Sequence, residues 1–214
     1  MLDPEKGEMK ARFAVTGARR AASVPGSSLG VAATGTELHV LDLKKMTASK
    51  FAGPGPQNPG YDDPVMTPDG KYLIAGASGQ IHRYALADGK LRYEESSPGV
   101  IQGRQDSGVT VSPDSKRVCY PSYVGGTGKP YTLAVFKVGD LQTPELILDP
   151  GGTLVGFDPV GGHIFTNNLR LYDNKGRFIK EYNLGGGGQI LPHPAGGAVL
   201  VVSDTVTAIT LPKK

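Results

Sequence analysis

A proline-centred turn that returns five times is the feature that most constrains the fold of this 214-residue chain. The prolines stand 35 to 46 residues apart, and an apolar run begins within six residues of each. Proline fixes its own φ, and the Gly, Asp or Ser that follows tolerates the bend, so each occurrence predicts a tight turn. Self-similarity at this period is typical of a repeat architecture. The turns fall at residues 24–27, 67–70, 112–115, 158–161 and 193–196.

A second repeated pattern supports the repeat indicated by the proline turns. Five strand-length runs with apolar first and fourth positions lie at 38–43, 81–86, 133–138, 169–174 and 206–211. A further run follows in four of the repeats, at 47–52, 90–95, 145–148 and 177–184. These runs are β-rich and bounded by Gly, Asp or Thr, which predicts strands. No stretch shows a helical period over twelve residues, so we expect almost no helix.

The fifth repeat ends at Lys214 without its fourth run. Residues 2–14 resemble residues 171–182: both read as a strand end, a Lys-Gly turn and an outer strand. We therefore expect residues 7–15 to supply the outer strand of the last repeat. Such a strand would close a ring and cover an exposed sheet edge.

The Asp residues at positions 42 and 173 and the turn Pro68-Asp69-Gly70 resemble those of divergent bacterial WD-repeat and YVTN-like β-propellers. The resemblance covers nearly the whole chain. It departs from the family in the absence of Trp and of a Gly-His dipeptide opening each repeat. The positions of the family's Trp are taken by Leu41, Tyr84, Phe136, Tyr172 and Ile209.

The resemblance implies an all-β fold, a five-bladed β-propeller with four antiparallel strands per blade and the last blade closed by the N-terminal strand. We expect one domain over 1–214, with blades at about 20–52, 63–97, 107–149, 153–184 and 189–214 plus the closing strand at 7–15. The alternative is an open fragment of a larger propeller that closes by oligomerising. The fold says little about function, since propellers host many activities.

The composition of the chain restricts the classes of partner that can be expected. A net charge of +3, from 23 basic and 20 acidic residues, is too mild for a nucleic-acid-binding surface. No segment is long and apolar enough to span a membrane. The single Cys119 excludes an internal disulfide and is predicted to be a buried thiol. Met1-Leu2-Asp3 is no signal peptide, so a cytoplasmic location is expected if Met1 is the natural start, and the compartment is otherwise unknown. We expect a monomer.

Long connections at 53–63, 98–107 and 123–130 predict a loop-rich face. In an up-and-down blade, second-to-third-strand loops and blade-to-blade connections emerge on the same face. Insertions on one face of a repeat protein often mark its binding face. Tyr and Arg are typical interface anchors, although these side chains could merely cover the blade ends. The candidate binding residues are Arg19, Tyr61, Asp62, Arg104, Asp106 and Tyr123.

No catalytic or metal-binding constellation stands out, and we expect no cofactor. The four His residues are scattered, whereas a metal needs converging ligands. Asp62 or Asp106 could face Asp158 across a ring, but Asp158 precedes a turn proline and a structural role is preferred. Glu94 and Glu95 are neighbours on a strand, so their side chains should point to opposite faces.

These observations favour a non-catalytic scaffold that recognises a protein, peptide or carbohydrate on the loop-rich face. One alternative is a glycoside hydrolase or lyase with its site in the central funnel, and another is a structural accessory domain of a larger protein. A channel lined by small apolar residues would favour the scaffold. Two facing carboxylates with perturbed pKa values would favour the enzyme.

Overall fold

The computed structural model describes residues 13–52, 64–77, 80–98, 101–102, 109–124, 132–148, 155–160, 162–166, 169–183, 189–202 and 205–212. Within these ranges the regular elements are all strands, and no helix occurs. The strands form five antiparallel sheets. The predictions of an all-β chain and of almost no helix are confirmed.

In each of the five sheets the strands pair in up-and-down chain order, and the third sheet has an additional short strand. The first sheet comprises β1 (Arg20–Ser23), β2 (Leu29–Ala33), β3 (Leu38–Asp42) and β4 (Thr47–Lys50). The second comprises β5 (Val65–Met66), β6 (Tyr72–Ala77), β7 (Gln80–Ala87) and β8 (Lys90–Ser96). The third comprises β9 (Ile101–Gln102), β10 (Thr110–Val111), β11 (Arg117–Val124), β12 (Thr132–Lys137) and β13 (Leu146–Leu148).

The last two sheets are smaller. The fourth comprises β14 (Val155–Phe157), β15 (Ile164–Thr166), β16 (Arg170–Tyr172) and β17 (Phe178–Glu181). The fifth has three strands, β18 (Gln189–Pro192), β19 (Ala198–Val202) and β20 (Val206–Thr210). Apart from the closing strand expected at 7–15, the strand runs predicted from the sequence coincide with strands to within a few residues.

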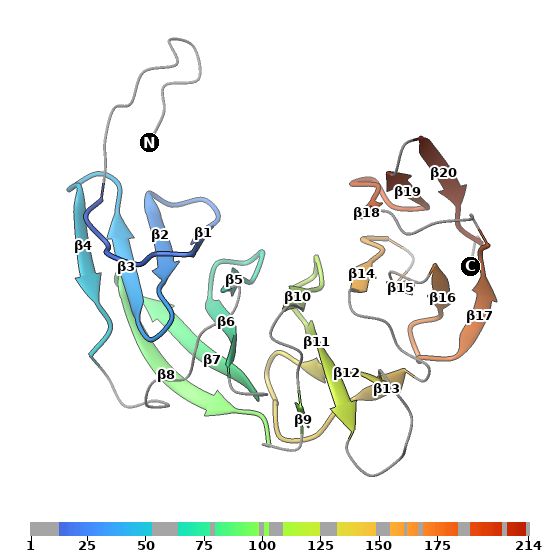
Figure 1. Ribbon diagram of the computed structural model, residues 1–214, viewed down its shortest axis with the longest axis horizontal. Coiled ribbons are helices and arrows are strands. Elements are labelled where there is room, and N and C mark those ends of the chain that lie inside the picture. The colour runs from blue at the N-terminus through green and yellow to red at the C-terminus, as the bar shows by residue number, and fades with distance from the viewer. Residues whose placement is uncertain are drawn as a thin grey trace.

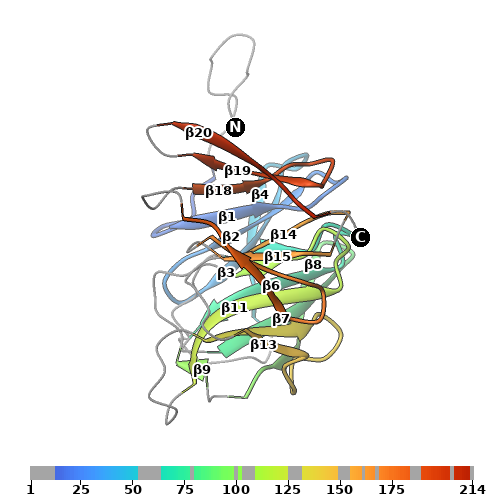
Figure 2. The same cartoon turned by 90° about the vertical axis from the view of Figure 1, so that its right-hand side faces the viewer.

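The sheets stand side by side in an arc, and their innermost strands are β1, β5, β10, β14 and β18 (Figure 1). Contacts join these inner strands in sequence order: β1 to β5, β5 to β10, β10 to β14 and β14 to β18. The first and last sheets stand at the two ends of the arc (Figure 1). In the perpendicular view the strands of the different sheets run roughly across the picture, and β9 lies at the lower left (Figure 2).

Among the described residues, the hydrophobic core consists of four clusters, each lying between two successive sheets. Because neighbouring side chains on a strand point to opposite faces, one middle strand serves two clusters. In β6, Leu73 joins the cluster shared with the first sheet and Ile74 the cluster shared with the third. In β11, Val118 faces the second sheet's cluster, and Cys119 packs with residues of the fourth. The core is therefore layered along the arc.

Three of the side chains at the family's Trp position are aromatic and fully buried: Tyr84, Phe136 and Tyr172 are each no more than 1% exposed. Tyr84 packs edge-to-face against Phe51 and Tyr93, with ring centroids 5.4 and 5.6 Å apart. Edge-to-face pairs add stability beyond the area that they bury. The predicted third-strand register thus supplies the largest core side chains.

The proline-centred turns share one backbone pattern. The N–H of the first turn residue donates to the carbonyl oxygen five residues later at 2.8 to 3.0 Å, starting from Val24, Thr67, Ser112, Asp158 and His193. The residue that reverses the chain has positive φ at Gly70 (+72°) and, unusually for a side chain, at Ser115 (+61°). The predicted tight turns are confirmed.

The fifth sheet has only three strands among the described residues. Of the predicted closing strand at 7–15, residues 13–15 are described and belong to no strand, and the remainder lies outside the described residues. The buried clusters join each sheet to the next one along the chain, from the first sheet to the fifth. A closed ring therefore stays a prediction.

Candidate functional site

Arg19 is the only predicted binding residue whose side chain is described. It is exposed, and its backbone N–H donates to the carbonyl of Ala33 at 2.9 Å. Its guanidinium carbon would lie 3.9 Å from a Cβ built on Gly35, in the turn between β2 and β3. The segment that leads into β1 therefore lies beside the turn between β2 and β3, as the up-and-down arrangement of the strands requires.

Two of the long connections also meet at this end of the sheets. Strand β9, within the connection 98–107, pairs antiparallel with the far end of β11: Gln102 opposes Tyr123, and Ile101 opposes Val124. This pairing brings the backbone of the predicted site residue Tyr123 beside the connection that carries Arg104 and Asp106. Tyr61, Asp62, Arg104 and Asp106 themselves lie outside the described residues.

The opposite, turn-bearing end holds a cavity of about 850 Å³, which is within the range of small-molecule sites. It lies between the third and fourth sheets. Its third-sheet wall is the β10–β11 turn, together with Lys137 at the end of β12, residues 138–140 after it, and Glu145. Its fourth-sheet wall is residues 157–160 with Gly162 and Asn174.

The third-sheet wall is charged. Arg117 donates two hydrogen bonds to Glu145, at 2.9 and 3.0 Å, which is the bidentate geometry of a strong pair. Its cross-strand partner is Lys137, and Lys116 precedes it in sequence. Lys116 and Lys137 are exposed, and neither ammonium group forms an ion pair with another described residue.

Carboxylates in this cavity are engaged by their own turns. Asp114 accepts hydrogen bonds from the Ser112 hydroxyl at 2.6 Å and the Lys116 N–H at 3.1 Å. Partial burial opposes ionisation of Asp114, but these bonds and the nearby positive charges outweigh it and lower the carboxyl pKa. Asp140 accepts from the Gln142 N–H at 3.0 Å.

The fourth-sheet wall is mostly apolar at its rim, where Val160 is 68% exposed. Beneath it Asp158 is buried and accepts a hydrogen bond from the Gly197 N–H, in the turn of the fifth sheet, at 3.0 Å. The Nδ1 of buried His163 lies 3.6 Å from the Asp158 carboxylate and has no hydrogen-bond partner. The structure thus places Asp158 in a turn-to-turn contact, beside the cavity, in agreement with a structural turn role.

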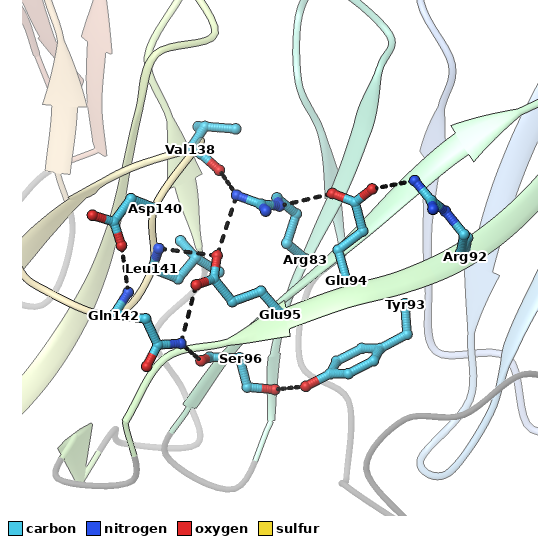
Figure 3. A network of polar contacts seen from close by, with 10 residues as sticks. All are labelled: Arg83, Arg92, Tyr93, Glu94, Glu95, Ser96, Val138, Asp140, Leu141 and Gln142. Atoms are coloured by element: carbon cyan, nitrogen blue, oxygen red, sulfur yellow. Dashed lines mark hydrogen bonds and ion pairs between the residues drawn. The ribbon is translucent and has the colours of Figure 1, made fainter.

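A polar network joins the second sheet to the third behind this cavity (Figure 3). Arg83 on β7 forms ion pairs with Glu94 at 3.2 Å and Glu95 at 3.3 Å, and it donates to the Val138 carbonyl. The guanidinium also lies 5.4 Å from the centroid of the Tyr72 ring, which lines the cavity.

Glu95 carries this network across to the third sheet. Its carboxylate accepts from the Leu141 N–H at 3.2 Å and the Gln142 side-chain amide at 3.0 Å (Figure 3). The expectation that Glu94 and Glu95 point to opposite faces is wrong here. A register shift between Arg83 and Tyr84 leaves Glu94 without a partner opposite, and this bulge lets both carboxylates reach Arg83.

Several other carboxylates serve turns rather than a shared site. Asp42 accepts from the backbone N–H groups of Lys45 and Lys44, and Asp173 from those of Arg177 and Lys175. These hydrogen bonds lower the pKa of both carboxyls despite a partial desolvation cost. Asp69 repeats the contacts of Asp114 and has a lowered pKa as well. Each is therefore an ionised turn cap at neutral pH.

Other predicted features can be assigned as well. Burial raises the pKa of the Cys119 thiol, as expected for a structural cysteine. No group of three or more His, Cys, Asp or Glu side chains that could hold a metal ion occurs in the part of the chain that the structure describes. The described residues also contain no helix that is long and apolar enough to cross a membrane.

Sequence reasoning missed the cavity because it assigned function to long connections and regarded the short turns as structural. The sequence nevertheless contains one indication of this cavity. Lys116-Arg117 is an adjacent basic pair, and it stands immediately after a proline turn. What the sequence alone could not supply is that Lys137 lies opposite Arg117 and that the fourth sheet closes the other side.

No protein-family model matches the chain, and no curated protein is significantly similar to it.

Proposed function

We propose that this chain is a non-catalytic binding scaffold that recognises a protein, peptide or carbohydrate on the loop-rich face. The observation that carries the proposal is the pairing of β9 with the end of β11. This pairing extends the third sheet with residues of two long connections. It thereby adds a short strand, at that end of the third sheet, to the four strands that pair in chain order. Functional residues in repeat proteins concentrate on such insertions.

The scaffold would be a closed ring of five blades, acting as a monomer, with residues 7–15 as the outer strand of the fifth blade. Support comes from the arc of five sheets and from the three-stranded fifth sheet, which lacks one strand relative to its neighbours. The added strand would lie beside β20 and remove an open edge.

The composition of the innermost strands favours binding over catalysis in a central funnel. Within their bounds, β1, β5, β10, β14 and β18 contain no Asp or Glu, and most of their residues are small or apolar. A glycoside hydrolase needs two carboxyl groups facing each other across the substrate. The turn carboxylates with lowered pKa values would also be poor general acids, since they hold no proton at neutral pH.

A test of this proposal pans the intact chain against a random peptide phage library and a glycan array. Ligands recovered there are then measured against Arg19→Ala, Tyr61→Ala and Arg104→Ala variants. At least one variant should weaken binding about tenfold, as expected for loss of an interface anchor. Arg92→Ala is the matched control, because Arg92 is an exposed arginine on the outer strand β8.

Unchanged affinity in all three loop-face variants would contradict recognition at this face. Hydrolysis of a glycan on the array, rather than retention of the protein, would instead support the enzyme.

A further inference from the structure

We propose that the outward face of the fifth sheet, which is turned away from the fourth sheet, docks onto the outward face of the first sheet of the same chain. This inference rests on the closed ring proposed above. It goes beyond that ring because it adds a fifth interface between sheets, distinct from the added strand beside β20. Three observations carry it: the register of the core residues, the exposed side chains of the fifth sheet and the small side chains of the first.

Two neighbouring residues of the second strand in each sheet serve its two faces. The residue six positions after the turn proline packs against the following sheet; these residues are Val31, Ile74, Cys119 and Phe165. The residue one position earlier packs against the preceding sheet; these residues are Leu73, Val118, Ile164 and Val199. The fifth sheet has Leu200 at the first position, and the first sheet has Gly30 at the second. The arc therefore ends in one face of each kind.

The outward face of the fifth sheet exposes apolar side chains at positions that the other sheets bury. Leu200 is half-buried, and its cross-strand partners are Leu191, which is 40% exposed, and Ala208. Val206 lies opposite Val202 on the same face and is 66% exposed. None of these residues belongs to the four buried clusters of the described residues, and β18, β19 and β20 contain no charged residue. An uncharged apolar patch of this kind marks an interaction surface.

The outward face of the first sheet offers a shallow apolar surface. Gly30 lies on it opposite Leu41, and a Cβ built on Gly30 would come within 3.9 Å of the Leu41 side chain, so the glycine leaves a depression there. The other residues around this pair are small, namely Ala21, Ser23, Ala32 and Ala48. The titratable strand residues of this face are His39 and Lys50, and both are paired with Glu37. Large aliphatic side chains of the fifth sheet would therefore meet small, uncharged ones.

The partner is the first sheet of the same chain rather than that of a second copy. Each chain carries one face of either kind, at the two ends of a single arc (Figure 1). Contact within one chain removes both faces from water and benefits from the high effective concentration of linked surfaces. Head-to-tail contact between copies would leave one face open at each end of the assembly, unless several copies closed a ring.

The test is a cross-link between the two faces. Ala21→Cys/Leu191→Cys places one thiol on the innermost strand of each terminal sheet, and Cys119 stays in place because it is buried. A short bismaleimide should join the two new cysteines within one chain, seen as a faster-migrating monomer in denaturing electrophoresis and identified by peptide mass spectrometry. The control is Ser49→Cys/Leu191→Cys, since Ser49 is exposed but pairs with Val40 on the face turned to the second sheet.

The control pair should cross-link little. A cross-linked dimer would overturn the proposal by showing that a second copy covers the face. Absence of a cross-link, or equal cross-linking of the control pair, would overturn it as well. Retained ligand binding without a cross-link would count against the docking alone, whereas lost binding in a cross-linked chain would count only against recognition at the loop-rich face.

Thermal melting gives a second readout. Leu191→Asp should lower the melting temperature by about 5 °C or more, because docking would bury the new carboxylate without a partner. Ile179→Asp is the matched control, since Ile179 on β17 is also 40% exposed and lies outside both faces. It should lower the melting temperature by less than about 2 °C. Equal shifts in the two variants would overturn the proposal.

Discussion

At the scale of single residues, a few polar side chains determine where the chain reverses. Thr67 and Asp69 in the second sheet make the same contacts as Ser112 and Asp114 in the third. In both turns the hydroxyl donates to the Asp at 2.6 Å and accepts the N–H of the next strand. The sequence predicted these turns because Pro, Asp and Gly act locally, without help from distant parts of the chain.

These turn carboxylates make stability depend on pH. The pKa of Asp69 and of Asp114 is lowered in the folded chain from an ordinary value of 3.8. Their stabilisation is complete above 3.8 and is lost as the pH falls through that value toward the folded pKa, because the unfolded chain takes up the protons first. The melting temperature should therefore fall between about pH 5 and pH 3.

The matched variant is Asp69→Asn/Asp114→Asn, which retains an acceptor oxygen but cannot titrate. Its melting temperature should depend less steeply on pH than that of the unaltered chain over this range. Identical pH profiles would show that these turns do not contribute to the acid sensitivity.

At the scale of elements, the strands were predictable from the sequence, but the bulge in one of them was not. Short β-rich runs between turn residues identify strands, as for β12 and β20, which coincide with the predicted runs 133–138 and 206–211 to within one residue. The bulge in β8, which lets Arg83 bind two carboxylates as well as a carbonyl of the next sheet, escaped prediction. The Arg83–Val138 contact joins residues 55 positions apart, and no local pattern encodes it.

Replacement of Arg83 by Met should destabilise the chain by about 3 kcal/mol, since it removes the largely buried cation that pairs with both Glu94 and Glu95. The Arg83 side chain is 12% exposed and those of Glu94 and Glu95 are 20% exposed. Arg92→Met is the control, because Arg92 also pairs with Glu94 but is 78% exposed. It should cost less than about 1 kcal/mol.

Urea denaturation measures both variants of this pair. Equal losses would contradict the view that Arg83 joins the second and third sheets. A loss from Arg83→Met that persists when Glu94 and Glu95 are both replaced by Gln would contradict it too.

At the scale of the whole molecule, the candidate sites depend on how the sheets are placed relative to one another. The sequence indicated which loops share an end, because up-and-down order dictates it, and the β9–β11 pairing agrees with that expectation. The sequence could not indicate which turns of neighbouring sheets face each other, and the cavity between residues 112–117 and 157–160 lies between two such turns. Closure of the arc is the remaining feature at this scale and the one on which the ring proposal depends.

Amide hydrogen exchange on β20 tests that closure most directly. Leu211 N–H donates to the Gly197 carbonyl, so by antiparallel alternation Thr207 and Ile209 direct their N–H groups toward β19, and Ala208 and Thr210 direct theirs outward. If residues 7–15 form the outer strand, the amides of Ala208 and Thr210 will be protected in the intact chain. They will exchange rapidly in a chain lacking residues 1–15, which will also melt at a lower temperature or associate. Rapid exchange of Ala208 and Thr210 in the intact monomer would contradict the closed ring.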